Sequence, residues 1–281
     1  MRYRSSGETI RVPEFFDLSG RAAIVTGAAG LLGREFARTL AEAGAAVVAA
    51  DVRREAVEHV TADLAEGGLT VRPAQVDVTS PSSVQSLVAE IERERGRLDV
   101  LVNSAALDPK FGTGEAGKHT SSFEDFPLEA WNQGLAVNLT GMFLACQAAA
   151  GLMRRGGSGS IINICSTYGL VGPDQRIYQR PGEAPRYKPV VYSVSKAGVL
   201  GLTRYLAAYF AGTNIRVNAL TPGGVFHDHD DEFVRSYSSR TVLGRMARKD
   251  EMNGALLFLA SDASSYMTGS NLVVDGGWTT W

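Results

Sequence analysis

A tyrosine and a lysine four residues apart are the clearest candidates for proton chemistry in this chain. If their segment is helical, Tyr192 and Lys196 lie one above the other on the same face. A free tyrosine has a pKa near 10, and a nearby ammonium lowers that pKa toward neutrality, where the phenol can exchange a proton with a substrate. Ser166 follows a predicted strand and could bond the same substrate oxygen. A tyrosine and a lysine at this spacing also occur on ordinary exposed helices, so the motif depends on its context.

A glycine-rich turn, residues 26–33, supplies that context. It follows a short apolar run and precedes a segment of helical period. Gly27 permits a sharp turn, Gly30 permits a pyrophosphate to approach the backbone, and Gly33 permits a helix to pack closely on a sheet. The free N–H groups at the start of that helix favour bound phosphate. The pattern predicts a dinucleotide site, with an ordinary glycine-containing loop as the alternative.

Acidic residues at two predicted strand ends indicate which dinucleotide is bound. Asp51 closes the second strand, where a carboxylate accepts hydrogen bonds from both ribose hydroxyls of NAD and repels the 2′-phosphate of NADP. Arg53 and Arg54 follow closely and could instead pair with a phosphate. We expect NAD rather than NADP as the cofactor. Asp77 and Val78, after the third strand, could contact the adenine, although Asp77 also suits a turn before a helix.

Alternating strands and helices must position these residues. The predicted strands are 22–25, 46–50, 71–76, 98–102, 160–164, 215–220 and 271–274, and the predicted helices are 34–43, 53–66, 81–95, 128–154, 191–211 and 250–260. Continuous apolar strands indicate a sheet that is buried on both faces. Strand–helix alternation predicts an α/β fold with a doubly wound, seven-stranded parallel sheet and helices on both faces. A ligand is then expected at the carboxyl ends of the strands.

With these motifs in order, residues 18–281 resemble the short-chain dehydrogenase/reductase family, which has a single Rossmann domain. Residues 26–33 resemble its cofactor loop, and 103–106 resemble the segment after its fourth strand. Ser166, Tyr192 and Lys196 match its catalytic Ser–Tyr–Lys set, and Asn138 matches a fourth catalytic residue. Residues 222–223 and the ending at 259–277 also resemble the family.

The resemblance implies hydride transfer between a nicotinamide cofactor and an alcohol/carbonyl pair. Tyr192 would exchange the hydroxyl proton, Lys196 would lower the pKa of that tyrosine and hold the ribose, Ser166 would orient the substrate oxygen, and Asn138 would hold a water. The cofactor-binding residues would be Gly27, Ala29, Leu31, Leu32, Asp51, Val52, Asp77, Val78, Asn103, Ala105, Tyr192, Lys196, Pro222, Gly223 and Val225.

The chain departs from the family pattern at three places. The middle glycine of the cofactor loop, Gly30, stands one position early, before Leu31. Ser104 replaces the second asparagine after the fourth strand. His227 stands where the family usually has a threonine that contacts the nicotinamide amide.

An insertion between Ser166 and Tyr192, near 169–190, is expected to pass close to the substrate. It is rich in arginine, tyrosine and polar residues, which favours a polyhydroxylated or anionic substrate such as a sugar, sugar acid or polyol. The expected substrate-binding residues are Ser166, Tyr168, Arg176, Tyr192 and His227. The alternative is a solvated loop or a subunit contact.

Two other functions stay open. A 3-oxoacyl-(acyl-carrier-protein) reductase would need a basic patch and a preference for NADP, which Asp51 disfavours. A catalytically silent nucleotide-binding scaffold would be expected to lack Ser166, Tyr192 or Lys196. Residues 227–232 contain histidine and acidic residues, but their spacing matches no defined metal site, so no metal is expected.

Composition sets the remaining expectations. The net charge of -2, from 28 basic and 30 acidic residues, provides no general polycation for nucleic acid or an anionic membrane. The N-terminus is polar, no apolar run reaches membrane-spanning length, and two cysteines form no disulfide framework. We expect a cytoplasmic enzyme with an N-terminal arm, 1–17, one catalytic domain, 18–281, and insertions near 107–122 and 169–190. Helices 128–154 and 191–211 predict a homotetramer, because they pair across subunits in the family.

Overall fold

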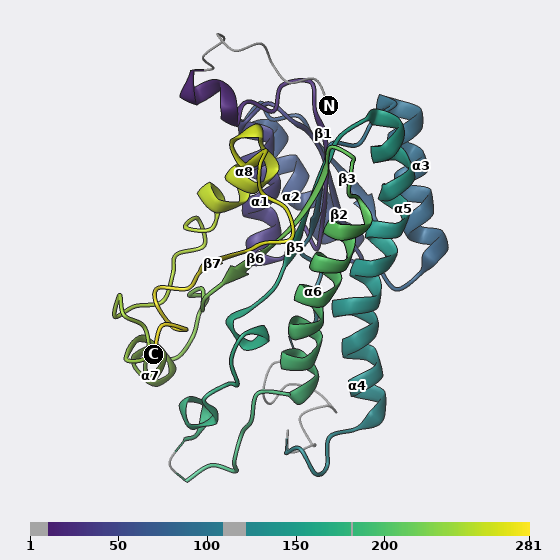
Figure 1. The fold of residues 1–281 in the computed structure, drawn as a ribbon. Helices are drawn as coiled ribbons and strands as arrows, with labels where there is room; N and C mark the ends of the chain where they lie inside the picture. The colour runs from purple at the N-terminus through teal and green to yellow at the C-terminus, as the bar shows by residue number, and fades with distance from the viewer. Residues whose placement is uncertain (1–10, 109–121, 181) are drawn as a thin grey trace.

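Seven parallel strands form one sheet in the computed structural model, which describes residues 11–108, 122–180 and 182–281 (Figure 1). The strand order is β3-β2-β1-β4-β5-β6-β7, so the connections reverse direction between β1 and β4. This confirms the predicted doubly wound parallel sheet. The strands are β1 (Ala22–Thr26), β2 (Ala46–Asp51), β3 (Val71–Gln75), β4 (Val100–Asn103), β5 (Gly159–Ile164), β6 (Ile215–Pro222) and β7 (Asn271–Val274).

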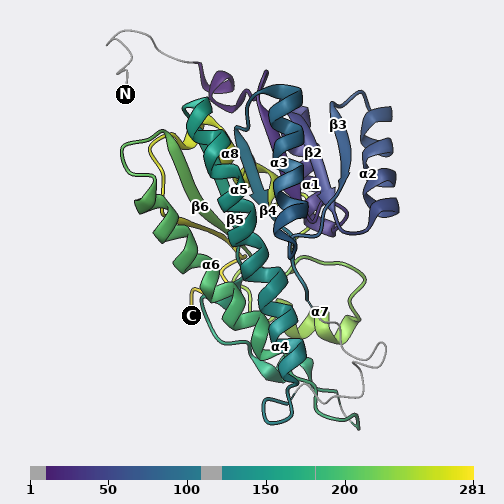
Figure 2. The same cartoon turned by 90° about the vertical axis from the view of Figure 1, so that its right-hand side faces the viewer.

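Helices cover both faces of the sheet (Figure 2). Apolar residues of α1, α2 and α8 form the core on one face, and those of α3, α5 and α6 form the core on the other. The bounds of these helices are α1 (Leu31–Glu42), α2 (Arg54–Glu66), α3 (Pro81–Arg95), α5 (Gly141–Gly156), α6 (Val190–Tyr209) and α8 (Asn253–Ala260). Helix α1 begins at Leu31, three residues before the predicted start, so it follows the glycine turn directly.

The central strands are buried along their whole length, as predicted, but the two edge strands are not. All residues of β1, β4 and β5 are buried, whereas β3 and β7 keep partly exposed residues. An edge strand has a neighbour on one side only, which also allows Pro73 within β3. The sheet is therefore buried at its centre and partly exposed at its two edges.

One helical stretch, Leu128–Gly156, is long and apolar enough to cross a membrane by length and composition alone, with a mean hydropathy of 1.5. The sequence prediction missed this run. The stretch comprises α4 (Leu128–Leu135), a π-helical turn (Ala136–Thr140) and α5. Ala149, Leu152 and Met153 of α5 are buried in the core beside α3 and the sheet. This placement is that of a core helix.

A short helix, α7 (Asp231–Ser238), is not among the helices predicted from the sequence. The carboxylate of Asp230 accepts a hydrogen bond from the Phe233 N–H at 2.8 Å and so caps the start of the helix. Phe233 and Val234 pack against a small aromatic cluster at the carboxyl ends of the strands. This helix therefore forms one side of the region in which a ligand is expected.

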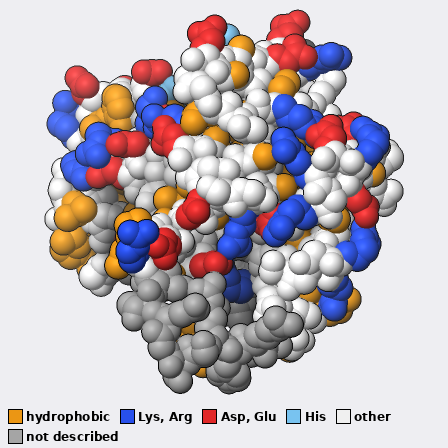
Figure 3. All heavy atoms as spheres, turned by 90° about the horizontal axis from the view of Figure 1, so that it is seen from above, with side chains coloured by type: hydrophobic (Ala, Val, Ile, Leu, Met, Phe, Trp, Pro, Cys, Tyr) orange, Lys and Arg blue, Asp and Glu red, His pale blue; other side chains and the backbone are white. Residues whose placement is uncertain are grey.

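Charged side chains of both signs are mixed over the face seen in Figure 3. Basic and acidic groups alternate there, and no broad area of one sign covers the described residues of this face. The pattern agrees with the small net charge of the chain.

Candidate active site

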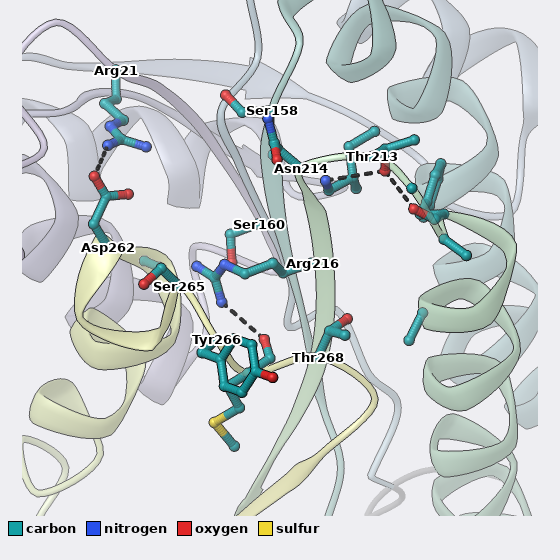
Figure 4. Close-up of a pocket in the computed structure, with 18 of the residues that line it drawn as sticks. Arg21, Ser158, Ser160, Thr213, Asn214, Arg216, Asp262, Ser265, Tyr266 and Thr268 are labelled. Atoms are coloured by element: carbon teal, nitrogen blue, oxygen red, sulfur yellow. Dashed lines mark hydrogen bonds and ion pairs between the residues drawn. The ribbon is translucent and has the colours of Figure 1, made fainter. Parts of the chain in front are cut away.

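Two hollows lie at opposite ends of the sheet. The larger, about 870 Å³, lies at the amino ends of β5 and β6 (Figure 4). Its arginines are already engaged: Arg21 pairs with Asp262 at 3.0 Å, and Arg216 donates to the carbonyls of Leu259 and Ser261 at 3.0 Å each. The smaller hollow, about 380 Å³, lies at the carboxyl ends and contains the predicted Ser–Tyr–Lys set. The predicted catalytic residues therefore make the smaller hollow the candidate active site.

The structure brings Ser166, Tyr192 and Lys196 together at that hollow. Ser166 directly follows β5, while Tyr192 and Lys196 lie on successive turns near the start of α6. The hydroxyl of Ser166 lies close enough to that of Tyr192 to lower the pKa of the phenol. Lys196 donates from Nζ to the Ile164 carbonyl at 2.8 Å, and the same Nζ lies 5.8 Å from the centre of the Tyr192 ring. A substrate oxygen can therefore meet two hydroxyls at one point, with the lysine beneath them.

Burial controls the ionisation of this set. It raises the pKa of Tyr192, and the negative charge of Asp108 acts in the same direction. The Ser166 hydrogen bond lowers that pKa but does not outweigh burial. Burial lowers the pKa of Lys196 to about 8. In the protein alone the phenol therefore stays protonated and is a proton donor, while the role of Lys196 in lowering the pKa of Tyr192 stays a prediction.

The lowered pKa of Lys196 predicts a pH-dependent stability. An unfolded lysine has a pKa of about 10.4, so between pH 8 and that value the unfolded chain holds a proton that the folded chain has lost. The free energy of unfolding contributed by this group therefore rises with pH across that window. Urea denaturation of wild type and Lys196→Met should show wild type gaining stability relative to the variant as pH increases. A relative loss over the same window would contradict the buried, depressed lysine.

Asn138 holds the backbone beside the site. It lies within the π-helical turn, a local irregularity that often marks functional positions. Its side-chain oxygen accepts from the Leu107 N–H at 2.6 Å, and its amide donates to the Leu107 carbonyl at 3.0 Å. The amide also lies 3.2 Å from the Ser195 hydroxyl. Asn138 thus fixes the chain after β4 to the central helix, while its predicted water-holding role stays a prediction.

The glycine turn forms a close-packed cradle that fits a dinucleotide phosphate. Gly27 has φ +68°, and a Cβ there would lie 2.7 Å from the Ala105 Cα. A Cβ at Gly33 would lie 2.1 Å from the Gly27 carbonyl oxygen. A side chain at either position would fill space that the turn needs, whereas a Cβ at Gly30 would meet only the Gly27 oxygen, at 3.2 Å. The early position of Gly30 therefore leaves the turn itself intact.

Asp51 lies beside this turn and is buried. Its Oδ2 accepts from the Ala29 N–H at 3.0 Å, and its Oδ1 accepts from the Arg53 N–H at 3.0 Å. The Arg53 guanidinium lies 3.3 Å from the same Oδ1. The carboxylate of Asp51 thus links β2 to the glycine turn. Arg53 lies close enough to Asp51 to be the alternative partner of a 2′-phosphate.

The other predicted cofactor residues divide into two groups. Those that line the hollow are Gly27, Leu31, Leu32, Pro222, Gly223 and Val225. Those outside its lining are Ala29, Asp51, Val52, Asp77, Val78, Asn103 and Ala105. Two of the second group have structural partners: the Asn103 amide donates to the Asn163 side chain at 2.9 Å, and the Asp77 carboxylate accepts from the Thr79 N–H at 2.8 Å. Their cofactor contacts stay predictions.

Of the predicted substrate residues, Tyr168 lines the hollow and two others do not. Tyr168 is buried, and its hydroxyl accepts from the Tyr178 hydroxyl at 2.8 Å. Arg176 points away, because its guanidinium pairs with Asp174 at 2.8 Å and stays 77% exposed. His227 is also exposed and outside the lining, where His229 takes a place instead. The structure therefore places Arg176 and His227 outside the lining of the hollow, and their substrate contacts stay predictions.

Several lining residues were not singled out from the sequence. They are Asp108, Tyr178, Lys188, His229, Phe233, Tyr237 and Met246. Burial raises the pKa of Tyr237 to about 12, and its hydroxyl accepts from the Gly224 N–H at 2.5 Å. Tyr178 and Lys188 belong to the insertion, whose aromatic and basic content was the only signal for them.

In residues 11–108, 122–180 and 182–281, no three His, Cys, Asp or Glu residues gather in a way that could hold a metal.

Comparisons with known proteins agree with this geometry. A family model described as enoyl-(acyl carrier protein) reductase matches residues 27–279. D-threitol dehydrogenase of Mycolicibacterium smegmatis is 35% identical over 269 residues, covering 94% of this chain and 95% of that protein. A 3-oxoacyl-[acyl-carrier-protein] reductase of Thermotoga maritima is 34% identical over 264 residues, covering 92% and 98%.

A solved structure is similar over nearly the whole chain. The crystal structure of a gluconate 5-dehydrogenase from Burkholderia cenocepacia, in complex with NADP and tartrate, has a TM-score of 0.83 and 32% identity. The match covers 96% of this chain and all of that one. With the seven-stranded parallel sheet and the Ser–Tyr–Lys set in place, the chain belongs to the short-chain dehydrogenase/reductase family and is an oxidoreductase that uses a nicotinamide cofactor on an alcohol or carbonyl group.

Proposed function

We propose that this enzyme interconverts a secondary alcohol and a ketone in a sugar, sugar acid or polyol, with NAD as the cofactor. The observation that carries the proposal is the hollow itself. Ser166 and Tyr192 line it together with Tyr168, Tyr178 and Lys188. Hydroxyl and ammonium groups can bond several substrate oxygens at once, which a lipophilic chain would leave unpaired. The names of the threitol and gluconate relatives support the same substrate class.

The chain's own residues would orient the substrate and move its proton. A bound nicotinamide supplies the hydride acceptor or donor. Ser166 would hold the reacting oxygen, and Tyr192 would give a proton to that oxygen in reduction or take one in oxidation. Lys196 would hold the cofactor ribose and, when charged, stabilise the phenolate that oxidation requires.

A matched substrate panel tests this proposal. Purified protein should reduce NAD when given threitol, sugar acids or other polyols, and NADH oxidation should follow with the corresponding ketones. Turnover confined to lipophilic ketones would overturn the proposal. Turnover of a 3-oxoacyl thioester in preference to every polyol would favour the carrier-protein reductase, a candidate that the Thermotoga maritima relative keeps open.

Cofactor choice is expected to depend on Asp51. The wild type should prefer NAD, because the carboxylate at the end of β2 suits two ribose hydroxyls and repels a phosphate. Asp51→Asn removes the charge, so we expect the ratio of kcat/KM for NAD to that for NADP to fall on the order of 10- to 100-fold. Asp63→Asn is the matched control, because Asp63 is a partly exposed acid of α2 that pairs with Arg34.

Equal use of both cofactors by the wild type would contradict this expectation. Such a result would indicate that the Arg53 side chain moves from Asp51 to the 2′-phosphate of NADP. The similar gluconate 5-dehydrogenase was crystallised with NADP, which is the reason to test this alternative. In that case Arg53→Met should weaken NADP binding while NAD binding is kept.

We also propose a cytoplasmic homotetramer that has no membrane or nucleic-acid partner. Phe143 of α5 and Tyr205 and Tyr209 of α6 are large exposed side chains on neighbouring helices, and a subunit contact would bury them. Light scattering that gives a monomer mass at micromolar concentration would contradict the tetramer.

A further inference from the structure

Lys188 is a second lysine beside the catalytic tyrosine, and it belongs to the insertion rather than to the Ser–Tyr–Lys set. Its Nζ lies 4.2 Å from the centre of the Tyr192 ring and 6.0 Å from that of Tyr168. The side chain is only 11% exposed, yet it lines the hollow. The ammonium of Lys188 thus lies over the ring of Tyr192, whose hydroxyl is expected to contact the reacting oxygen of the substrate. Substituents next to the reacting carbon would then lie near this ammonium.

The backbone holds Lys188 in this position. Its N–H donates to the Gln175 side-chain oxygen at 2.8 Å, which links the two arms of the insertion. Pro189 follows, directly before the first residue of α6, the helix that carries Tyr192. Since a residue before proline is restricted to extended backbone, the backbone of Lys188 is held at a fixed place relative to the helix that carries the tyrosine.

The counter-ion of Lys188 lies at the rim of the hollow. Asp108 Oδ1 is 2.5 Å from Lys188 Nζ, and the Asp108 side chain is 54% exposed. The pair is therefore asymmetric, with a desolvated ammonium and a carboxylate that water can reach. A buried ammonium needs a negative partner, whereas a carboxylate at the rim can be released to water at little cost.

The arginines of the insertion are engaged elsewhere. Arg176 pairs with Asp174, Arg180 with Asp230 at 2.9 Å, and Arg186 with Glu183. None of the three lines the hollow. Lys188 is thus the cation that the insertion presents to the substrate, among the residues that the structure describes.

We propose that Lys188 binds a carboxylate of the substrate and that Asp108 is its partner when no such group is bound. The inference rests on the proposed function and narrows its substrate class to a polyhydroxylated acid. A substrate carboxylate that displaces Asp108 keeps the buried ammonium paired. A neutral hydroxyl cannot neutralise the ammonium, so a neutral polyol leaves the Lys188–Asp108 pair in place and gains no ion pair.

Threitol and threonate provide a matched pair of substrates, because threonate is threitol with one terminal carbon oxidised to a carboxylate. We expect the wild type to have a higher kcat/KM for threonate. In Lys188→Met that value should fall on the order of 10- to 100-fold, mainly through KM, whereas the value for threitol should fall far less, because threitol loses no ion pair. Arg186→Met is the control from the same insertion, and it should change neither.

Tartrate binding gives a readout that needs no turnover. Calorimetry of the protein with NAD should show tartrate binding that Lys188→Met weakens and Arg186→Met does not. Asp108→Asn should strengthen it, because the competing carboxylate has lost its charge. Equal losses for threitol and threonate in Lys188→Met would overturn the inference and show that Lys188 acts through Tyr192. Tartrate binding or threonate turnover that is insensitive to Lys188 would also overturn it.

These outcomes separate the inference from the proposed function. Turnover of threitol without binding of tartrate would reject the carboxylate site and keep the polyol dehydrogenase. Tartrate binding through Lys188 without turnover of any polyol would keep the carboxylate site and reject the proposed reaction.

Discussion

Tyr192→Phe is expected to lower kcat by about 10²- to 10⁴-fold, the range that general acid–base groups contribute. The substitution removes only the phenol oxygen. The ring stays in place, so its contacts with Lys188 and Lys196 at 4.2 and 5.8 Å are kept. Steady-state kinetics with NAD and a polyol that the wild type oxidises provides the measurement.

Cofactor binding separates a catalytic loss from a folding loss in this variant. NAD affinity and the melting temperature of Tyr192→Phe should match those of the wild type, because no packed atom other than the hydroxyl oxygen is lost. Turnover equal to that of the wild type would reject Tyr192 as the proton donor. A variant that no longer binds NAD would show that the hydroxyl is structural.

Gly33→Ala is expected to weaken both folding and cofactor binding. The new Cβ would lie 2.1 Å from the Gly27 carbonyl oxygen and 2.9 Å from the Ala28 Cα. Both neighbours are backbone atoms of the phosphate turn, so α1 or the turn must shift. Overpacking of this kind costs about 1–3 kcal/mol in the free energy of unfolding. Urea denaturation and NAD titration should therefore both show a loss.

Gly254→Ala is the matched control, because Gly254 is also helical and a Cβ there would meet no atom within 4 Å. This variant should be as stable as the wild type or more stable, by up to about 1 kcal/mol from helix propensity. If both alanine variants behaved alike, the close contact between α1 and the turn would have no energetic importance.

Parts of the fold and site that depend on local spacing could be predicted from the sequence. The four-residue interval between Tyr192 and Lys196 sets one helix face, and the interval between Gly27 and Gly33 sets a turn at a helix start. The apolar runs of β1, β4 and β5 predict buried strands because each strand has neighbours on both sides.

Contacts between distant segments could not be predicted in this way. Arg176 was expected at the substrate, but no sequence pattern shows that Asp174, two residues earlier, neutralises it. Lys188 meets Asp108 only because the insertion folds back toward the segment after β4. The start of α7 had a local signal in Asp230 and the two acids that follow, a pattern typical of a helix N-terminus.

The two hollows also could not be ranked from the sequence. The larger one gathers residues from the amino ends of β5 and β6 and from the loop before β7, whereas the smaller one gathers residues from the carboxyl ends. Volume alone would favour the wrong end of the sheet. The Ser–Tyr–Lys set and the glycine turn, which both line the smaller hollow, assign the chemistry to it.

A crystal structure with NAD and a polyol acid tests the central claim most directly. The account predicts the pyrophosphate at the turn formed by Gly27 and Gly33, and a substrate oxygen within hydrogen-bond distance of both Ser166 Oγ and Tyr192 Oη. A substrate bound in the larger hollow beside Arg216 and Tyr266, or one that contacts neither hydroxyl, would contradict it.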